Sequence, residues 1–210
     1  MLTTPAPVFN NIIDPQELLD LKAQSDQFIF RSVEHYWQEP RFSDWVHSVL
    51  STRKKRGEAV LVVEKNERIL LHTKSFYPSG TWRLLSGGIH YDESILSAAR
   101  RELSEETGFT ADRIQPMGAI LYQFKKQNVQ KVVPFASFLF YINSTDKNPR
   151  PEDETEDIAG FKWINYRDLA TVSGDLGLLH QHWQAWGKFR AMPHDIAHRW
   201  LLNYHTKRAD

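Results

Sequence analysis

The chain contains no cysteine, which excludes disulfide bonds, thiolate metal sites and cysteine nucleophiles. It also has no excess of charge, because 26 lysines and arginines balance 26 aspartates and glutamates. This balance argues against a dedicated nucleic-acid binder. No apolar run reaches the roughly 18 residues that cross a membrane, and the first seven residues lack the pattern of a secretory signal. From these absences we expect a soluble, cytoplasmic protein with no membrane partner.

Apolar and aromatic residues, by contrast, are plentiful. Hydrophobic residues make up 41% of the 210 residues, and aromatic residues make up 12%. This content suffices for the core of one domain of ordinary size, with extensions packed onto it.

Residues 1–57 are predicted to form a helical N-terminal extension. Asp14 precedes Pro15, the order that is typical of a helix cap and a first helical residue. A second helix is expected at Phe42–Thr52. We interpret the basic run Arg53–Arg56 that follows as a solvated, charged linker.

Residues 58–170 have the pattern of an α+β domain. A helix is expected at Asp92–Thr107, because Gly108 can adopt the left-handed conformation that ends helices. Short apolar and β-branched runs predict strands on both sides of it, at 59–63, 69–72, 82–85, 117–124, 132–142 and 161–164. This order of elements predicts an α/β/α sandwich with a mixed sheet.

Residues 171–210 are predicted to be a helical C-terminal extension packed on the core. Trp183 and Trp186 are three residues apart and share one helix face. This face is expected to pack on the central domain or against the second subunit of a homodimer. Lys188 and Arg190 are expected at the helix edge. With His194 they are candidates to reach a phosphate at the substrate cleft, but we favour capping of the helix, and for Arg190 a surface position.

Three acidic side chains gather on one face of the predicted helix at Asp92–Thr107. Glu102, Glu105 and Glu106 are three and four residues apart, near the helix end that repels negative charge. A hard divalent cation bound by oxygen ligands would offset this repulsion; Mg²⁺ is expected, with Mn²⁺ as an alternative. Gly87 and Gly88 allow close approach of the backbone, so that a main-chain carbonyl is a further candidate ligand.

The full spacing around these acids is specific. From Gly87 to Phe109 the chain follows Gly-x5-Glu-x7-Arg-Glu-apolar-x-Glu-Glu-x-Gly-apolar at all nine fixed positions over 23 residues. In this segment the sequence resembles the Nudix hydrolases, whose signature box has this pattern. The resemblance covers about residues 57–170 and implies the α/β/α sandwich fold and hydrolysis of a phosphoanhydride bond.

The resemblance also implies roles for individual residues. Glu102 and Glu106 match the principal metal ligands, and the carbonyl of Gly87 matches the backbone ligand. Arg101 matches the arginine that orients the glutamates. Glu105 is implied as a further metal ligand or as the general base. Glu93 matches the first glutamate of the box, which supports the loop and helix geometry.

Two questions stay open at this point. The general base is Glu105 or an acid of the segment 151–157, where Glu156 and Glu154 both lie at a suitable distance before Trp163. For substrate binding, Arg83 is a candidate phosphate contact or a surface residue. Aromatic candidates for stacking on a base include Tyr91, Phe76 and Tyr77, for which packing is the alternative.

The expected function is Mg²⁺-dependent hydrolysis of a nucleoside diphosphate linked to another moiety. The alternative is a non-catalytic module that senses nucleotides or binds a protein through the N-terminal helices and Arg53–Arg56. The complete set of box glutamates favours the enzyme. The leaving group stays open, since the window that follows the box lacks the tyrosine or proline markers of two known subfamilies.

Overall fold

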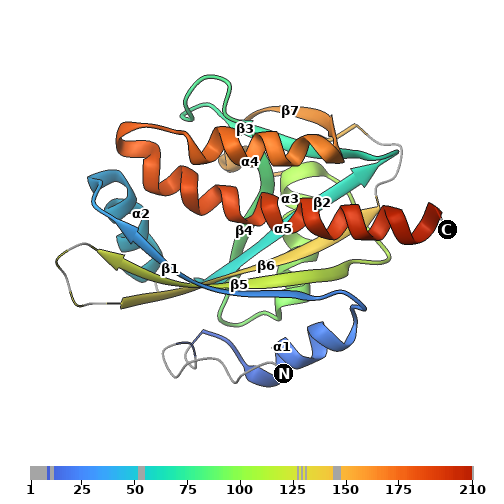
Figure 1. Cartoon of the computed structure of the whole chain (residues 1–210), viewed down its shortest axis with the longest axis horizontal. Helices are drawn as coiled ribbons and strands as arrows, with labels where there is room; N and C mark the ends of the chain where they lie inside the picture. The colour runs from blue at the N-terminus through green and yellow to red at the C-terminus, as the bar shows by residue number, and fades with distance from the viewer. Residues whose placement is uncertain are drawn as a thin grey trace.

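The protein is described by a computed structural model that covers residues 9, 12–51, 55–126, 128, 130, 132–143 and 148–209 (Figure 1). Within these ranges, the side chains at 41, 47–51, 154 and 209 are not described. Of the described helices, none is long and apolar enough to cross a membrane.

A mixed seven-stranded sheet forms the centre of the molecule, in the order β1-β5-β6-β2-β4-β3-β7. The pairs β1–β5 and β2–β6 are parallel, and the other neighbours are antiparallel. The strands are β1 (Ile29–Trp37), β2 (Lys55–Lys65), β3 (Arg68–Lys74), β4 (Arg83–His90), β5 (Gln115–Lys126), β6 (Val132–Asn143) and β7 (Ile158–Asn165).

Helices cover both faces of this sheet (Figure 1). Side chains of β2 alternate between two apolar layers: Leu61 and Val63 pack with α1 (Pro15–Ala23) and α3 (Ile95–Thr107), while Val60 and Val62 face the opposite layer. That opposite layer contains α2 (Pro40–Ser51), α4 (Leu169–Gly177) and α5 (Gln184–Ala209). The expected α+β fold, an α/β/α sandwich with a mixed sheet, is confirmed.

The N-terminal extension differs from the expected all-helical segment. Both predicted helices are present as α1 and α2, but β1 lies between them and pairs in parallel with β5 from Ile29 to Trp37. The sequence prediction missed β1 because it is an edge strand in which only two of nine side chains, His35 and Trp37, are buried, so that it lacks a clear apolar alternation. Its partner lies about 90 positions away in the sequence (for example Ser32 opposite Leu121), so no local signal marks the pairing.

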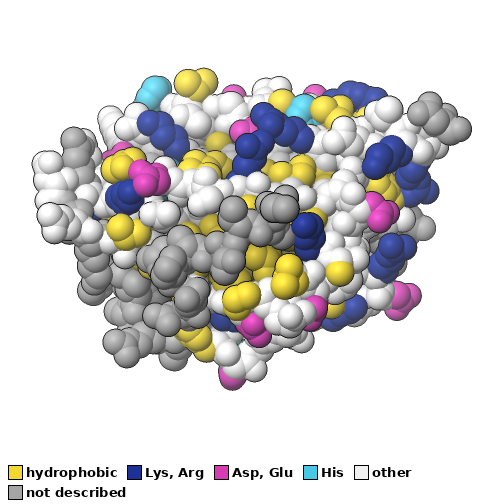
Figure 2. Space-filling view, turned by 60° about the horizontal axis from the view of Figure 1, so that its bottom comes forward, with side chains coloured by type: hydrophobic (Ala, Val, Ile, Leu, Met, Phe, Trp, Pro, Cys, Tyr) yellow, Lys and Arg dark blue, Asp and Glu magenta, His cyan; other side chains and the backbone are white. Residues whose placement is uncertain are grey.

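The expected solvated linker at Arg53–Arg56 is wrong where the structure describes it. Lys55 and Arg56 begin β2, and Arg56 forms an ion pair with Glu17 of α1 at 2.8 Å. Residues 53 and 54 lie outside the described ranges. On the face drawn in Figure 2, basic side chains are interspersed with acidic and apolar ones, in keeping with the balanced total charge.

The C-terminal helix α5 crosses the sheet face opposite α3 (Figure 1). Trp186 of α5 is buried, as is Trp183, which ends the short 3-10 helix Gln181–Trp183 just before α5 and so does not share its helix. The rings of Trp183 and Trp186 lie 6.1 and 4.9 Å from the ring of Tyr77. Further along α5, Trp200 is fully buried and packs on Tyr141 with ring centroids 5.2 Å apart. This apolar contact fixes α5 on the core along most of its length.

Candidate active site

Helix α3 determines where the acidic side chains point. It begins after Ser94, whose hydroxyl accepts a hydrogen bond from the Ser97 amide, and it ends at Gly108 with φ of 67°. The sequence placed the start three residues earlier, at Asp92. Leu103 packs on the sheet together with the other apolar residues of the helix. Glu102 and Glu106 adjoin this apolar side and are only 3% and 0% exposed.

Three of the four oxygens of the buried Glu102 and Glu106 carboxylates lack hydrogen-bond partners. Oε2 of Glu102 and both oxygens of Glu106 have none, although all three atoms are buried. Burial raises the pKa of Glu102 to about 7 and that of Glu106 to about 8. Arg101 pairs with one oxygen of Glu102 only, so ionisation of both buried carboxylates is costly unless a cation binds as well. This donor set of unpaired carboxylate oxygens fits a hard divalent metal ion.

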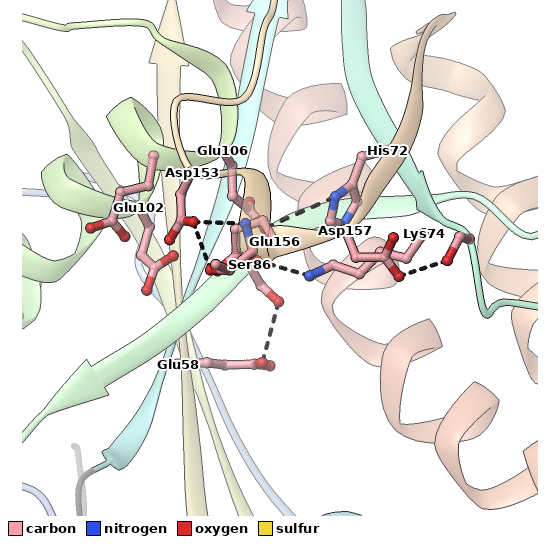
Figure 3. Close-up of polar contacts among 12 residues, drawn as sticks. Glu58, His72, Lys74, Ser86, Glu102, Glu106, Asp153, Glu156 and Asp157 are labelled. Carbon is pink, nitrogen blue, oxygen red and sulfur yellow. Dashed lines mark hydrogen bonds and ion pairs between the residues drawn. The ribbon is translucent and has the colours of Figure 1, made fainter.

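Arg101 connects several residues of the box (Figure 3 shows Glu102 and Glu106). Its guanidinium donates hydrogen bonds of 2.7 Å to each of Glu93, Glu102 and Glu105. It also donates to the carbonyl of Gly88 at 2.8 Å. One arginine therefore orients a ligand candidate, a base candidate and the loop before the helix.

Gly87 is required by packing against α3. A Cβ atom at this position would lie 1.7 Å from the carboxylate carbon of Glu102, much closer than any side chain permits. The strand and the helix can meet at this distance only because position 87 has no side chain. Among the described residues, no three acidic or histidine side chains already converge as a complete metal site. Glu102 and Glu106 are brought together, while Glu105 is held by Arg101.

A cleft of about 470 Å³ runs beside β4. Its lining includes Arg83, Gly87, Lys74 and Glu156, and the rings of Trp45, Phe76, Tyr77, Phe135 and Trp186. Glu102, Glu105 and Glu106 line neither this cleft nor the larger hollow of about 630 Å³ beside α1, and the cleft borders the box through Gly87 and Gly88. The cleft beside β4 combines basic groups for phosphate with aromatic rings for a planar base.

Glu156 reaches this cleft from a short 3-10 helix (Glu154–Glu156) before β7 (Figure 3). Its Oε2 accepts a hydrogen bond from the Lys74 ammonium at 2.8 Å. Its negative charge contributes to the raised pKa values of Glu102 and Glu106, after the larger effect of burial. The side chain of Glu154 lies outside the described part of the structure.

The substrate-binding candidates separate into two groups. Arg83 is buried and lines the cleft, where it donates to the Tyr77 hydroxyl at 2.7 Å and to Ser86 at 2.8 Å. Phe76 and Tyr77 also line it. Tyr91 is 51% exposed and borders the separate hollow beside α1, so the structure does not bring it to the cleft.

At the cleft, Glu58 was not found from the sequence, and Arg190 was a candidate for which a surface position was favoured. Glu58 of β2 is buried and accepts a hydrogen bond from Arg190 of α5 at 2.6 Å and from Ser137 at 2.7 Å. The expected surface position of Arg190 is wrong, since the residue is 8% exposed and lines the cleft. An acidic residue at the start of an apolar strand was a usable signal for Glu58. No local pattern marked Arg190.

Comparison with known proteins agrees with this geometry. A model of the NUDIX domain matches residues 53–186, so the chain belongs to the Nudix family. It is 38% identical over 65 residues to an oxidized purine nucleoside triphosphate hydrolase of Danio rerio, covering 31% of this chain and 42% of that protein. It is 29% identical over 108 residues to an RNA pyrophosphohydrolase of Bartonella clarridgeiae, covering 45% and 62%.

These curated relatives are matched over only part of their length, 42% and 62% in the two cases. Among solved structures, the chain is similar to the mutator MutT protein of Bacillus halodurans. That similarity has a TM-score of 0.46 and 22% identity, and covers 56% of this chain and 75% of that one.

Proposed function

We propose that this protein hydrolyses a phosphoanhydride bond in a nucleoside diphosphate linked to another moiety, with Mg²⁺ as its cofactor and Mn²⁺ as an alternative. One observation carries the proposal: three buried carboxylate oxygens, one of Glu102 and two of Glu106, have no hydrogen-bond partner, and the Glu102 carboxylate lies against Gly87. A buried group of this kind is costly unless a cation compensates it.

Glu102 and Glu106 are the proposed principal metal ligands, with the Gly87 carbonyl and Glu105 as further candidates. When bound, the metal ion would neutralise phosphate charge and lower the pKa of water at the site. The remaining work falls to side chains of the chain itself. Arg101 holds Glu102 and Glu105 in fixed orientations through its two 2.7 Å hydrogen bonds.

Two acids are candidates to accept the proton of the attacking water. Glu156 lines the cleft and is held by Lys74, which makes it accessible to a bound water. Glu105 is partly exposed but is engaged by Arg101. Their positions favour Glu156, because Glu156 lines the cleft and Glu105 does not.

Substrate binding is proposed for the basic and aromatic groups of the cleft. Lys74 and Arg83 supply positive charge beside Gly87 and are suited to phosphate oxygens. The rings of Phe76 and Tyr77 are suited to stacking on a base. Tyr91, the other candidate from the sequence, has no support from its position.

The names of the relatives support the reaction class. The Danio rerio protein is named for hydrolysis of oxidized purine nucleoside triphosphates, and the Bartonella clarridgeiae protein for RNA pyrophosphohydrolysis. Both names describe attack on a phosphoanhydride of a nucleotide. A cytoplasmic location and a homodimer stay predictions.

The test is a substrate panel. Purified protein is incubated with MgCl₂ or MnCl₂ and with nucleoside triphosphates, dinucleoside polyphosphates and nucleoside-diphosphate conjugates, and products are identified by mass. We expect cleavage of at least one compound between two phosphorus atoms, and loss of this activity in excess EDTA. Tight binding of nucleotides without any product would instead support the non-catalytic module.

A further inference from the structure

Strand β4 changes its partner in the middle of the site. Arg83 and Leu84 pair with β3, whereas β4 pairs with β2 from Leu85 onward. The pairing partner of β4 therefore changes from β3 to β2 between Leu84 and Leu85. The cleft is lined by residues on both sides of this point, Arg83 before it and Ser86 after it.

The Leu84 amide is bonded to the C-terminal helix. It donates a 3.0 Å hydrogen bond to Nε2 of His194. The other ring nitrogen, Nδ1, lies 2.8 Å from the carbonyl oxygen of Arg190 in the same helix. Because an amide only donates and a carbonyl only accepts, the ring must carry its proton on Nδ1. A neutral imidazole thus bridges the backbone of α5 and the backbone of β4.

A second contact from α5 reaches β4 two residues later. Arg190 donates through Nη1 to Glu58 at 2.6 Å and to the Ser86 hydroxyl at 3.2 Å. Ser86 also accepts from Arg83 and donates to Glu58, so the four side chains form one buried network. Ser86 directly precedes Gly87, the residue that lies against Glu102.

We propose that His194 and Arg190 are positioning residues, which fix β4 at Leu84 and Ser86 and thereby set where Gly87 lies against the carboxylates of α3. The C-terminal helix then determines the geometry of the active site, in addition to packing on the sheet. The consequence for turnover rests on the proposed hydrolase function, whereas the consequence for β4 does not.

Anchoring of α5 does not require these polar contacts. Trp186 and Trp200 already hold the helix on the core through buried ring contacts. Buried polar bridges contribute little net stability compared with apolar packing of the same volume, because both partners lose their hydration. The hydrogen bond from the Leu84 amide to His194, at the point where β4 changes its partner strand, instead fixes the position of β4.

The experiment compares three variants by amide hydrogen exchange of the metal-free protein, read at single residues by NMR. His194→Phe keeps a ring of similar size and removes the acceptor. His194→Gln retains an acceptor at about the position of Nε2. His198→Phe, one turn further along α5, is the matched control, because His198 has no described bond to β4. Melting temperatures are recorded for all three.

We expect exchange at Leu84 to rise by about tenfold or more in His194→Phe, since an unpaired buried donor is costly. Exchange in β5 should change much less, and His194→Gln and His198→Phe should keep Leu84 protected. Equal acceleration throughout the sheet in His194→Phe, or no change at Leu84, would overturn the proposal, because the histidine would then only stabilise the fold.

Turnover is measured on the same variants with a substrate identified from the panel. We expect His194→Phe to lower kcat by about tenfold with a smaller change in KM, as a misplaced Gly87 acts on the reaction more than on binding. Unchanged kcat together with faster exchange at Leu84 would overturn the link between β4 and the reaction. Absence of any substrate, with the expected exchange pattern, would count against the proposed function alone.

Discussion

The box segment Gly87–Phe109 and the C-terminal helix α5 line the same cleft, but only the box is marked by a local sequence pattern. In the box, Glu102 and Glu106 lie on one face of one helix, and their spacing in the sequence already places them side by side. Arg190 and His194 reach β4 across 104 and 110 positions of the chain. The sequence spacing therefore identifies the two glutamates, whereas the contacts of Arg190 and His194 with β4 are seen only in the folded chain.

The two regions also balance their buried polar groups differently. The box leaves carboxylate oxygens of Glu102 and Glu106 without partners, which suits a site that takes up a cation. The α5 side satisfies most of its polar atoms within the protein: Glu58 accepts from Arg190, Ser86 and Ser137. The unpaired carboxylate oxygens at the box thus indicate cation binding, whereas the paired groups under α5 indicate a role in positioning β4.

The largest effect is expected from removing charge at the box. Glu106→Gln should lower kcat by roughly two to four orders of magnitude, because a metal ion contributes several kcal/mol and each ~1.4 kcal/mol is tenfold. The fold should remain intact, since an amide replaces a buried group of the same size. Steady-state kinetics and circular dichroism check this. Glu67→Gln, on a side chain that is 57% exposed, is the matched control. Full activity of Glu106→Gln would remove the metal mechanism.

A second variant pair separates the candidate bases. If Glu156 accepts the proton, Glu156→Gln should lower kcat by roughly 10²–10⁴-fold and leave Mn²⁺ binding nearly unchanged. Glu105→Gln should then act mainly on metal affinity or on Arg101. Measurements at saturating substrate, with Mn²⁺ binding followed by electron paramagnetic resonance, distinguish the two. The reverse pattern would assign the base to Glu105, and silence of both variants would contradict either assignment.

The buried ion pair under α5 should show strong coupling. Arg190→Met leaves Glu58 buried without its cation and should destabilise the protein by about 3–5 kcal/mol. Glu58→Gln combined with Arg190→Met removes both charges and should recover most of that loss. Urea unfolding of the two single variants and the double variant gives the coupling free energy. Additive effects would show that the pair does not act as a unit.

The two regions should also respond to pH with opposite signs. Burial raises the pKa of Glu102 to about 7 and of Glu106 to about 8, from an ordinary value of 4.5. The folded state therefore binds more protons than the unfolded state between these values, and metal-free stability should fall as pH rises from 4.5 to 8. Added Mg²⁺ should reduce this fall. Thermal melts across pH, with and without Mg²⁺, measure it, and an identical profile in Glu106→Gln would contradict the assignment.

The smallest effect is expected from His35, which contacts α5 through the Ala185 carbonyl at 3.0 Å. Burial lowers its pKa to about 4 from an ordinary 6.5. The unfolded state binds the extra proton, so this contribution is complete above pH 6.5 and is lost as pH falls toward 4, on the order of 2–3 kcal/mol. In the same thermal melts, the stability of His35→Phe should decrease less steeply as pH falls. A slope equal to that of the unmodified protein would show that His35 does not titrate in this range.

Sequence reasoning succeeded where the pattern was local and failed where it was not. The strands around the box and helix α3 followed from apolar runs, from Gly108 and from the spacing of the acids. Strand β1 was missed because only two of its nine side chains are buried and its partner β5 is distant in the sequence. Arg190 was placed at the surface because a lone arginine on a helix is usually exposed, and its buried partner Glu58 lies 132 positions earlier.

The sequence by itself determined the family and the carboxylate face of α3, because a 3.6-residue period converts spacing directly into proximity. It also determined that α5 would carry buried tryptophans. Only the tertiary structure decided that Arg190 and His194 meet β4, and that Tyr91 lies outside the cleft. Such contacts depend on how separate helices and strands cross in space. They leave no periodic pattern in the sequence from which they could be predicted.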